Sequence, residues 1–164
     1  MDLSKYSLTD LFLTGIRSEM DSKTVYEGLA NRVQNAFMKD RLMFLAKEED
    51  RHRAFIEQIY KDNFPGQEIV VPTTTPVPLP EVALDNEMMP ISEVLEMAMK
   101  AELAAREFYT ALAERFPETS NSRRILLYFG KMELGHYEIL KTEQENAKVF
   151  EEFDQTWNMM HVGP

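Results

Sequence analysis

Apolar residues recur at helical spacing in four long stretches of the chain, separated by short polar breaks and one proline-rich segment. In each stretch they fall three or four residues apart, which is the period of an amphipathic helix. The pattern predicts helices over about residues 8–33, 36–61, 91–116 and 121–147. Ser7, Ser92 and Ser120 lie at or near the starts of three of them, where serine can cap a helix. The chain is therefore predicted to be all-α.

The connection between the second and third helices, residues 62–90, has a different composition. It contains six of the eight prolines, which are incompatible with a helix interior and favour extended chain. A helix of about 26 residues is ~39 Å long, and this segment is long enough to travel that distance when extended. We therefore expect a long crossover that leaves the second and third helices parallel. Whether this crossover is exchanged between two protomers is left open.

Charged residues and histidines interrupt the apolar face of every predicted helix. The first and third helices each carry one glutamate there, and the second and fourth each carry a Glu-x-x-His unit. Residues three apart are neighbours on one face of a helix, so each unit can close on a single metal ion. The six candidate metal ligands are Glu19, Glu49, His52, Glu102, Glu133 and His136.

The two halves of the chain repeat one another. An offset of 83 residues aligns Glu19 with Glu102 and Tyr26 with Tyr109, and both halves read Glu-x6-Tyr-x-x-Leu-Ala-x-Arg. An offset of 84 aligns the two Glu-x-x-His units. The repeat predicts two helical hairpins related by an approximate two-fold axis, each contributing half of one site.

The ligand pattern is that of di-iron and di-manganese carboxylate bundles. Four ionised carboxylates in an apolar core are very costly unless they are paired or protonated. Two divalent cations balance their charge, and carboxylates with imidazoles suit iron, with manganese or a mixed pair as alternatives. By symmetry, Glu49 and Glu133 are expected to bridge the ions and Glu19 and Glu102 to be terminal. The alternative is a satisfied buried polar network without metal.

Each lone glutamate is followed seven residues later by a tyrosine on nearly the same helix face. Tyr26 and Tyr109 are therefore candidates to hydrogen-bond the ligand carboxylates across the bundle. The alternative is that their rings are core, with each hydroxyl on some other polar partner. His161 is interpreted as an ordinary surface residue.

Charge and composition exclude several classes of function. The net charge of −10 argues against binding to nucleic acid or to anionic membranes. No cysteine is present, which excludes disulfides, zinc–thiolate sites and cysteine nucleophiles. The sequence has neither a signal peptide at Met1 nor an apolar run of membrane-spanning length. We expect a cytoplasmic protein.

The chain resembles the rubrerythrin-type branch of the ferritin-like di-iron superfamily over about residues 8–147. The resemblance rests on the six candidate ligands and on the residues that surround them in the sequence. The resemblance implies a ferritin-like four-helix bundle whose di-iron site reduces hydrogen peroxide or reacts with dioxygen. Two features depart from rubrerythrin. Ala105 stands where that family carries an extra carboxylate, and a chain without cysteine has no rubredoxin domain. Electrons are therefore expected from an external donor.

Two other functions stay open, namely ferroxidase or iron handling and a metal-stabilised interaction module without turnover. Residues 1–147 are predicted to form the bundle. Residues 148–164 are too apolar for a free tail, and we expect part of them to pack as a short helix on the bundle or on a partner. A homodimer is the expected assembly.

Overall fold

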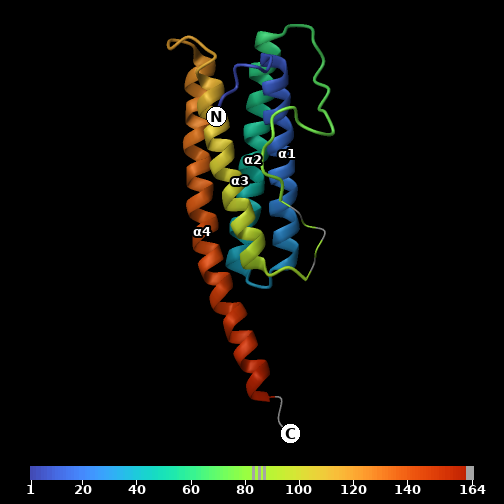
Figure 1. Cartoon of the computed structure of the whole chain (residues 1–164), viewed down its shortest axis with the longest axis vertical. Helices are drawn as coiled ribbons and strands as arrows, with labels where there is room; N and C mark the ends of the chain where they lie inside the picture. The colour runs from blue at the N-terminus through green and yellow to red at the C-terminus, as the bar shows by residue number, and fades with distance from the viewer. Residues whose placement is uncertain (83, 85, 87, 162–164) are drawn as a thin grey trace.

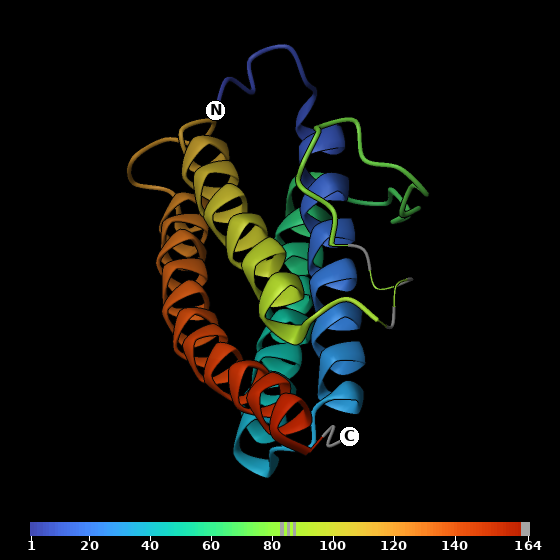
Figure 2. The same ribbon diagram turned by 60° about the horizontal axis from the view of Figure 1, so that its bottom comes forward.

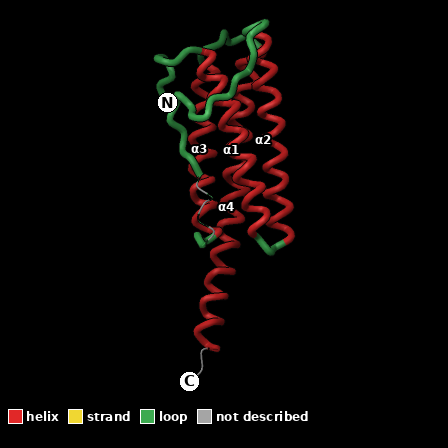
Figure 3. Tube along the Cα trace, turned by 90° about the vertical axis from the view of Figure 1, so that its right-hand side faces the viewer, coloured by secondary structure: helices red, strands yellow, loops and turns green. Residues whose placement is uncertain are grey.

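The computed structural model describes the backbone of residues 1–82, 84, 86 and 88–161, and the side chains of those residues up to 153. It contains four helices and, in this part of the chain, no strand (Figures 1 and 3). The helices are α1 (Leu8–Arg32), α2 (Ala36–Asn63), α3 (Ile91–Ala113) and α4 (Asn121–His161). This confirms the predicted all-α four-helix bundle. Among the described residues, no helix combines the length and apolarity needed to cross a membrane.

The helices pack as two hairpins, α1 with α2 and α3 with α4. Residues 64–90 leave α2 at one end of the bundle and reach α3 at the other, so α2 and α3 point the same way (Figure 1). Figure 2 shows this segment on the outer side of α1. Gly28 permits a close approach there, because a Cβ at that position would lie 2.7 Å from Leu84 Cδ1.

Polar side chains begin three of the helices. Ser7 forms a capping box with Asp10, the Asn35 side chain accepts from the Met38 amide, and Ser120 Oγ accepts from the Arg123 amide at 3.1 Å. These bonds satisfy amides that have no partner within the helix. The predicted caps at positions 7 and 120 are thus confirmed.

The predicted cap of α3 is wrong. The helix begins at Ile91, as predicted, so Ser92 lies inside it, and the N-cap residue, Pro90, offers no side-chain bond. Glu151 of α4 takes that role instead, because its carboxylate accepts from the Ser92 amide at 3.0 Å and from the Ser92 hydroxyl at 2.5 Å. A residue 59 positions away therefore caps the helix, which no local pattern can show.

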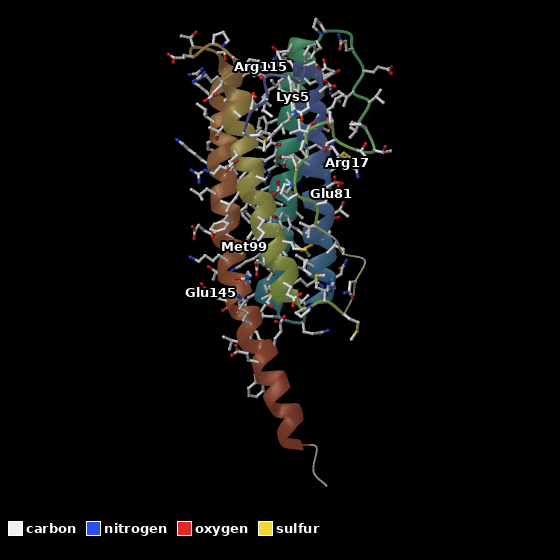
Figure 4. The ribbon with its side chains drawn as sticks, in the orientation of Figure 1. Lys5, Arg17, Glu81, Met99, Arg115 and Glu145 are labelled. Carbon is white, nitrogen blue, oxygen red and sulfur yellow. The ribbon has the colours of Figure 1, made fainter. Side chains whose placement is uncertain are left out.

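Glu151→Ala is expected to lower the free energy of unfolding by about 1 kcal/mol, the usual cost of losing an N-terminal cap. The reason is that the first-turn amide of Ser92 loses its acceptor. Chemical denaturation followed by circular dichroism measures the effect. Glu145→Ala, at an exposed position of the same helix (Figure 4), is the control and should change stability by less than about 0.5 kcal/mol. Equal losses in both variants would contradict the capping role.

Two helix ends differ from those predicted. The third helix stops at Ala113 rather than Phe116, where the amides of Arg115 and Phe116 bond carbonyls three residues back, just before Pro117. The fourth helix continues beyond Ala147 to His161, since no glycine or proline interrupts the sequence there. The continuation extends past the end of the bundle (Figure 1).

The apolar core consists of two clusters. One surrounds Phe12 and Phe129, and the other surrounds Leu29 and Leu140. On every helix, the interrupting polar residues lie in sequence between members of the two clusters, as Glu19 lies between Ile16 and Tyr26 on α1. The fold thus places one polar layer in the middle of the bundle.

Candidate metal centre

The six candidate ligands converge in this polar layer, and all four helices contribute. Each is at most 3% exposed. They form two groups of four, in which ligand-capable atoms lie within 4.8 Å of one another. The first group is Glu19, Glu49, His52 and Glu133, and the second is Glu49, Glu102, Glu133 and His136. The two groups share Glu49 and Glu133.

Distances from the histidines show why these two carboxylates are shared. His52 Nδ1 lies 3.4 Å from Glu49 and 3.2 Å from Glu133, while His136 Nδ1 lies 3.0 Å from each of the same residues. Glu19 and Glu102 each approach one histidine, His52 at 3.6 Å and His136 at 3.7 Å respectively. The arrangement has two central and two outer carboxylates.

The imidazole rings of His52 and His136 lie side by side. Their centroids are 5.4 Å apart and their planes differ by 16°. Phe129 closes one side, with its ring centroid 4.7 Å from that of His52. His52 on α2 and His136 on α4 therefore both direct Nδ1 toward Glu49 and Glu133.

Burial raises the pKa of two of the carboxylates in the cluster. It raises the pKa of Glu49 well above its usual range, and the charges of Glu133, Glu19 and Glu102 raise it further. Burial also raises the pKa of Glu102 to about 8, because the attraction of His136 does not offset it. Without a cation, the ionised form of both groups is therefore disfavoured.

The remaining charges concentrate on Glu133 and the histidines. Burial opposes ionisation of Glu133, but the attraction of His136 and His52 outweighs it and lowers the pKa to about 2. Burial likewise opposes the charged form of His52, yet contacts with Glu133, Glu19 and Glu49 raise its pKa to about 12. The pKa of His136 is raised well above its usual range by the carboxylates around it, against burial. Glu133 and the two histidines thus favour their charged forms within the cluster.

The donor set and its geometry fit metal ions. Buried polar atoms normally have hydrogen-bond partners, but several here make no well-aligned hydrogen bond despite their short separations. They include both ring nitrogens of each histidine, Oε1 of Glu49 and both oxygens of Glu133. Carboxylate oxygens and imidazole nitrogens that converge without pairing are satisfied by cations placed between them. The cluster is therefore a site able to bind metal ions.

The two tyrosines contact the outer carboxylates reciprocally. Tyr26 on α1 donates its hydroxyl to Glu102 on α3, and Tyr109 on α3 donates to Glu19 on α1. The two helices run in opposite directions, so equal seven-residue spacings bring each tyrosine to the other helix's glutamate (Figure 1). Burial, and then the charge of the partner glutamate, raises the pKa of each tyrosine well above its usual value. Both hydroxyls therefore remain donors at neutral pH.

A cavity of about 460 Å³ lies between α1, α3 and the crossover. Tyr26 and Ala101 form part of its wall, and Ala101 precedes Glu102 in the sequence. Arg17 and Glu81 stand on the α1 and crossover sides of this cavity (Figure 4). The sequence shows no signal for this cavity, because the crossover reaches α1 only through the tertiary fold. The side chain of His161 lies outside the described part of the chain.

Comparison with known proteins covers both halves of the chain. The family described as rubrerythrin matches residues 10–88 and 93–160, and these ranges contain all six candidate ligands. A solved structure of a hypothetical protein from Pyrococcus furiosus is 31% identical, with a TM-score of 0.77. The similarity covers 91% of this chain and 95% of that one. No curated protein matches the chain.

Proposed function

Because the chain belongs to the rubrerythrin family, we propose that it is a di-iron oxidoreductase that reduces hydrogen peroxide or activates dioxygen, with electrons from an external donor. The observation that carries the proposal is the sharing of Glu49 and Glu133 by the two four-residue groups. Shared carboxylates between two imidazoles are the ligand pattern of di-iron carboxylate bundles. We further propose that the protein acts in the cytoplasm, as a homodimer.

The six residues would divide between two ions in equal sets. Glu19 and His52 would hold one, Glu102 and His136 the other, and Glu49 and Glu133 would bridge them. Four carboxylates balance two divalent cations, and the oxygen-rich set with one imidazole per ion suits iron, with manganese as the alternative. Ala105, partly buried against the apolar core, adds no further carboxylate.

The ions, when bound, would supply the electrons for the reduction. The chain's own residues would hold the carboxylates in position and deliver the protons. Breaking the O–O bond of peroxide to form two waters consumes two electrons and two protons. Tyr26 and Tyr109 hold Glu102 and Glu19 by hydrogen bonds and carry protons within the buried layer. The cavity beside Tyr26 would admit a small oxidant while the surrounding core excludes bulk water.

Tyr26→Phe and Tyr109→Phe are each expected to weaken metal affinity about 10-fold, since outer hydrogen bonds to ligands contribute 10–100-fold. The reason is that the terminal carboxylate loses the donor that orients it. Metal titration of the purified variants measures the affinity, and stopped-flow mixing with peroxide measures the rate. Tyr128→Phe, at an exposed site on α4, is the control. Unchanged affinity in both buried variants would contradict the role.

The proposed activity is tested with protein loaded anaerobically with ferrous iron. Mixing with peroxide should oxidise the iron rapidly, and a donor such as reduced rubredoxin should then sustain peroxide consumption. Absence of both reactions would refute the proposal. Iron storage requires a large hollow shell, so size-exclusion chromatography separates that alternative. Preserved biological activity in a metal-free Glu49→Ala variant would instead favour a non-catalytic interaction module.

A further inference from the structure

The candidate metal centre is closed off from solvent. Each of its six ligands is at most 3% exposed, and the polar layer that they form lies between the two apolar clusters of the core. Moving an unpaired ion through an apolar region is very costly, because the ion loses its hydration there. A metal ion therefore needs a polar route to these ligands.

The cavity between α1, α3 and the crossover has the size and lining of the outer part of such a route. Its volume is about 460 Å³. One water occupies about 30 Å³ in the liquid, so the cavity has room for a cation together with a shell of waters. Hydroxyl oxygens, which can hydrogen-bond those waters, line it from α1 and from the crossover. They belong to Ser18, Ser22, Thr24, Thr73, Thr74 and Thr75.

The charges of the cavity favour a cation. Arg17 and Asp21 of α1 both line it and pair with each other, with Arg17 Nε 2.8 Å from the carboxylate. Glu81 adds an exposed carboxylate from the crossover side (Figure 4). Among the described residues that line the cavity, two carboxylates thus accompany one guanidinium. Such an excess of negative charge raises the local concentration of cations.

Tyr26 belongs to both the cavity and the polar layer. It lines the cavity, and its hydroxyl donates to the outer carboxylate Glu102. Ala98 and Ala101 line the same cavity from α3, one helical turn and one residue before Glu102. Tyr26 itself is only 1% exposed. It is therefore a side chain that both bounds the cavity and holds one of the candidate ligands.

The corresponding tyrosine of the other half has different surroundings. The repeat aligns Tyr26 with Tyr109, but Tyr109 is fully buried in an apolar cluster of the core. Its ring centroid lies 5.3 Å from that of Phe108 and 5.8 Å from that of Phe129. A Cβ added at Gly15 would lie 3.4 Å from its hydroxyl, so α1 packs closely against it. The two halves of the site, alike in sequence, are thus unequal around their tyrosines.

We propose that divalent metal ions enter the centre through the crossover cavity and that Tyr26 is the gate at its inner end. The hydrated ion is held first near Asp21 and Glu81. It then exchanges water for the carboxylate of Glu102 when the Tyr26 hydroxyl releases that carboxylate. Tyr109 remains closed, so loading begins from the Glu102 side. This inference rests on the metal centre proposed above.

A removable block in the cavity tests the route. Since the chain has no cysteine, Ser22→Cys places a single thiol in the cavity wall, one turn before Tyr26. A bulky disulfide label on this thiol should slow the loading of cobaltous ion about 10-fold or more, because charged clefts raise association rates by 10–1,000-fold. Stopped-flow absorbance measures the rate. Equilibrium titration should show an unchanged affinity, and removal of the label by a reductant should restore the rate.

Ser122→Cys, half-buried at the start of α4, is the matched control and should load at the parent's rate with or without the same label. Circular dichroism verifies that each labelled variant is folded. If labelled Ser22→Cys protein took up cobaltous ion as fast as unlabelled protein, the route would be wrong. A parent protein that binds no cobaltous ion would overturn the metal centre as well.

The gate is tested with a second matched pair. Tyr26→Phe and Tyr109→Phe each remove one hydrogen bond to an outer carboxylate. Only Tyr26→Phe frees the carboxylate beside the cavity, so it should load cobaltous ion faster than Tyr109→Phe does. The same stopped-flow measurement compares the two rates. Equal rates, or faster loading of Tyr109→Phe, would overturn the assignment of Tyr26 while leaving the metal centre in place.

Discussion

Glu49→Gln is expected to reduce metal binding from two ions to at most one and to slow peroxide reduction by about 100-fold or more. Loss of an outer hydrogen bond alone costs 10–100-fold, and Glu49 would contact both ions. The metal-free variant, in contrast, should be more stable than the metal-free parent, because burial and neighbouring charges disfavour the Glu49 carboxylate. Metal analysis, peroxide consumption and thermal denaturation measure the three effects.

Glu48→Gln is the matched control for this experiment. Glu48 is the preceding residue, is also buried, and pairs with Arg51 rather than with the cluster. It should retain two ions and most of the activity. If Glu49→Gln bound two ions as well, the bridging assignment would be wrong. Loss of a ligand should raise the stability of the metal-free protein and lower that of the metal-loaded protein. Loss of a residue that only supports the fold should not change the two stabilities in opposite directions.

The metal-free protein is expected to lose stability as pH rises from 6.5 to 8. The pKa of Glu102 is about 8 in the folded chain against 4.5 ordinarily, and that of His52 is about 12 against 6.5. In this window the folded state binds more protons than the unfolded chain, so a rising pH favours unfolding. Glu133, with a pKa of about 2, is ionised throughout and adds no slope.

Metal loading is expected to reverse this dependence. Ions must displace the protons on the cluster, so they bind more strongly as pH rises. At a free metal concentration 100 times the dissociation constant, binding adds about 2.7 kcal/mol to the free energy of unfolding. Calorimetric melting at pH 6.5 and 8, with and without manganous ion, checks both signs. A metal-free melting temperature that rises over this range would refute the assigned proton distribution.

Much of the candidate site is predictable from the sequence because its chemistry repeats. Helical period places Glu49 beside His52 and Glu133 beside His136, and the offset of 83 or 84 residues pairs the two halves. The same repeat predicts the central and outer positions of the carboxylates. These inferences need only local helix geometry and the cost of burying unpaired charge.

Contacts between distant segments are not predictable in this way. The capping of α3 by Glu151 and the cavity under the crossover join residues that no local pattern relates. The seven-residue spacing makes Tyr26 and Tyr109 candidates to bond carboxylates across the bundle, but it does not show which glutamate each tyrosine contacts. The end of α4 is a related case, since Ala147 is the last buried position of the helix in the described range but not its last residue.

The sequence by itself thus determined the helices, their duplication and the six residues of the polar layer, because helical period and charge act over short range. The tertiary structure decided which tyrosine bonds which glutamate, where the cavity beside Tyr26 forms and how far α4 extends beyond the bundle. Those features depend on the relative direction and height of packed helices. These features are stabilised by the burial of side chains between segments that are far apart in the chain.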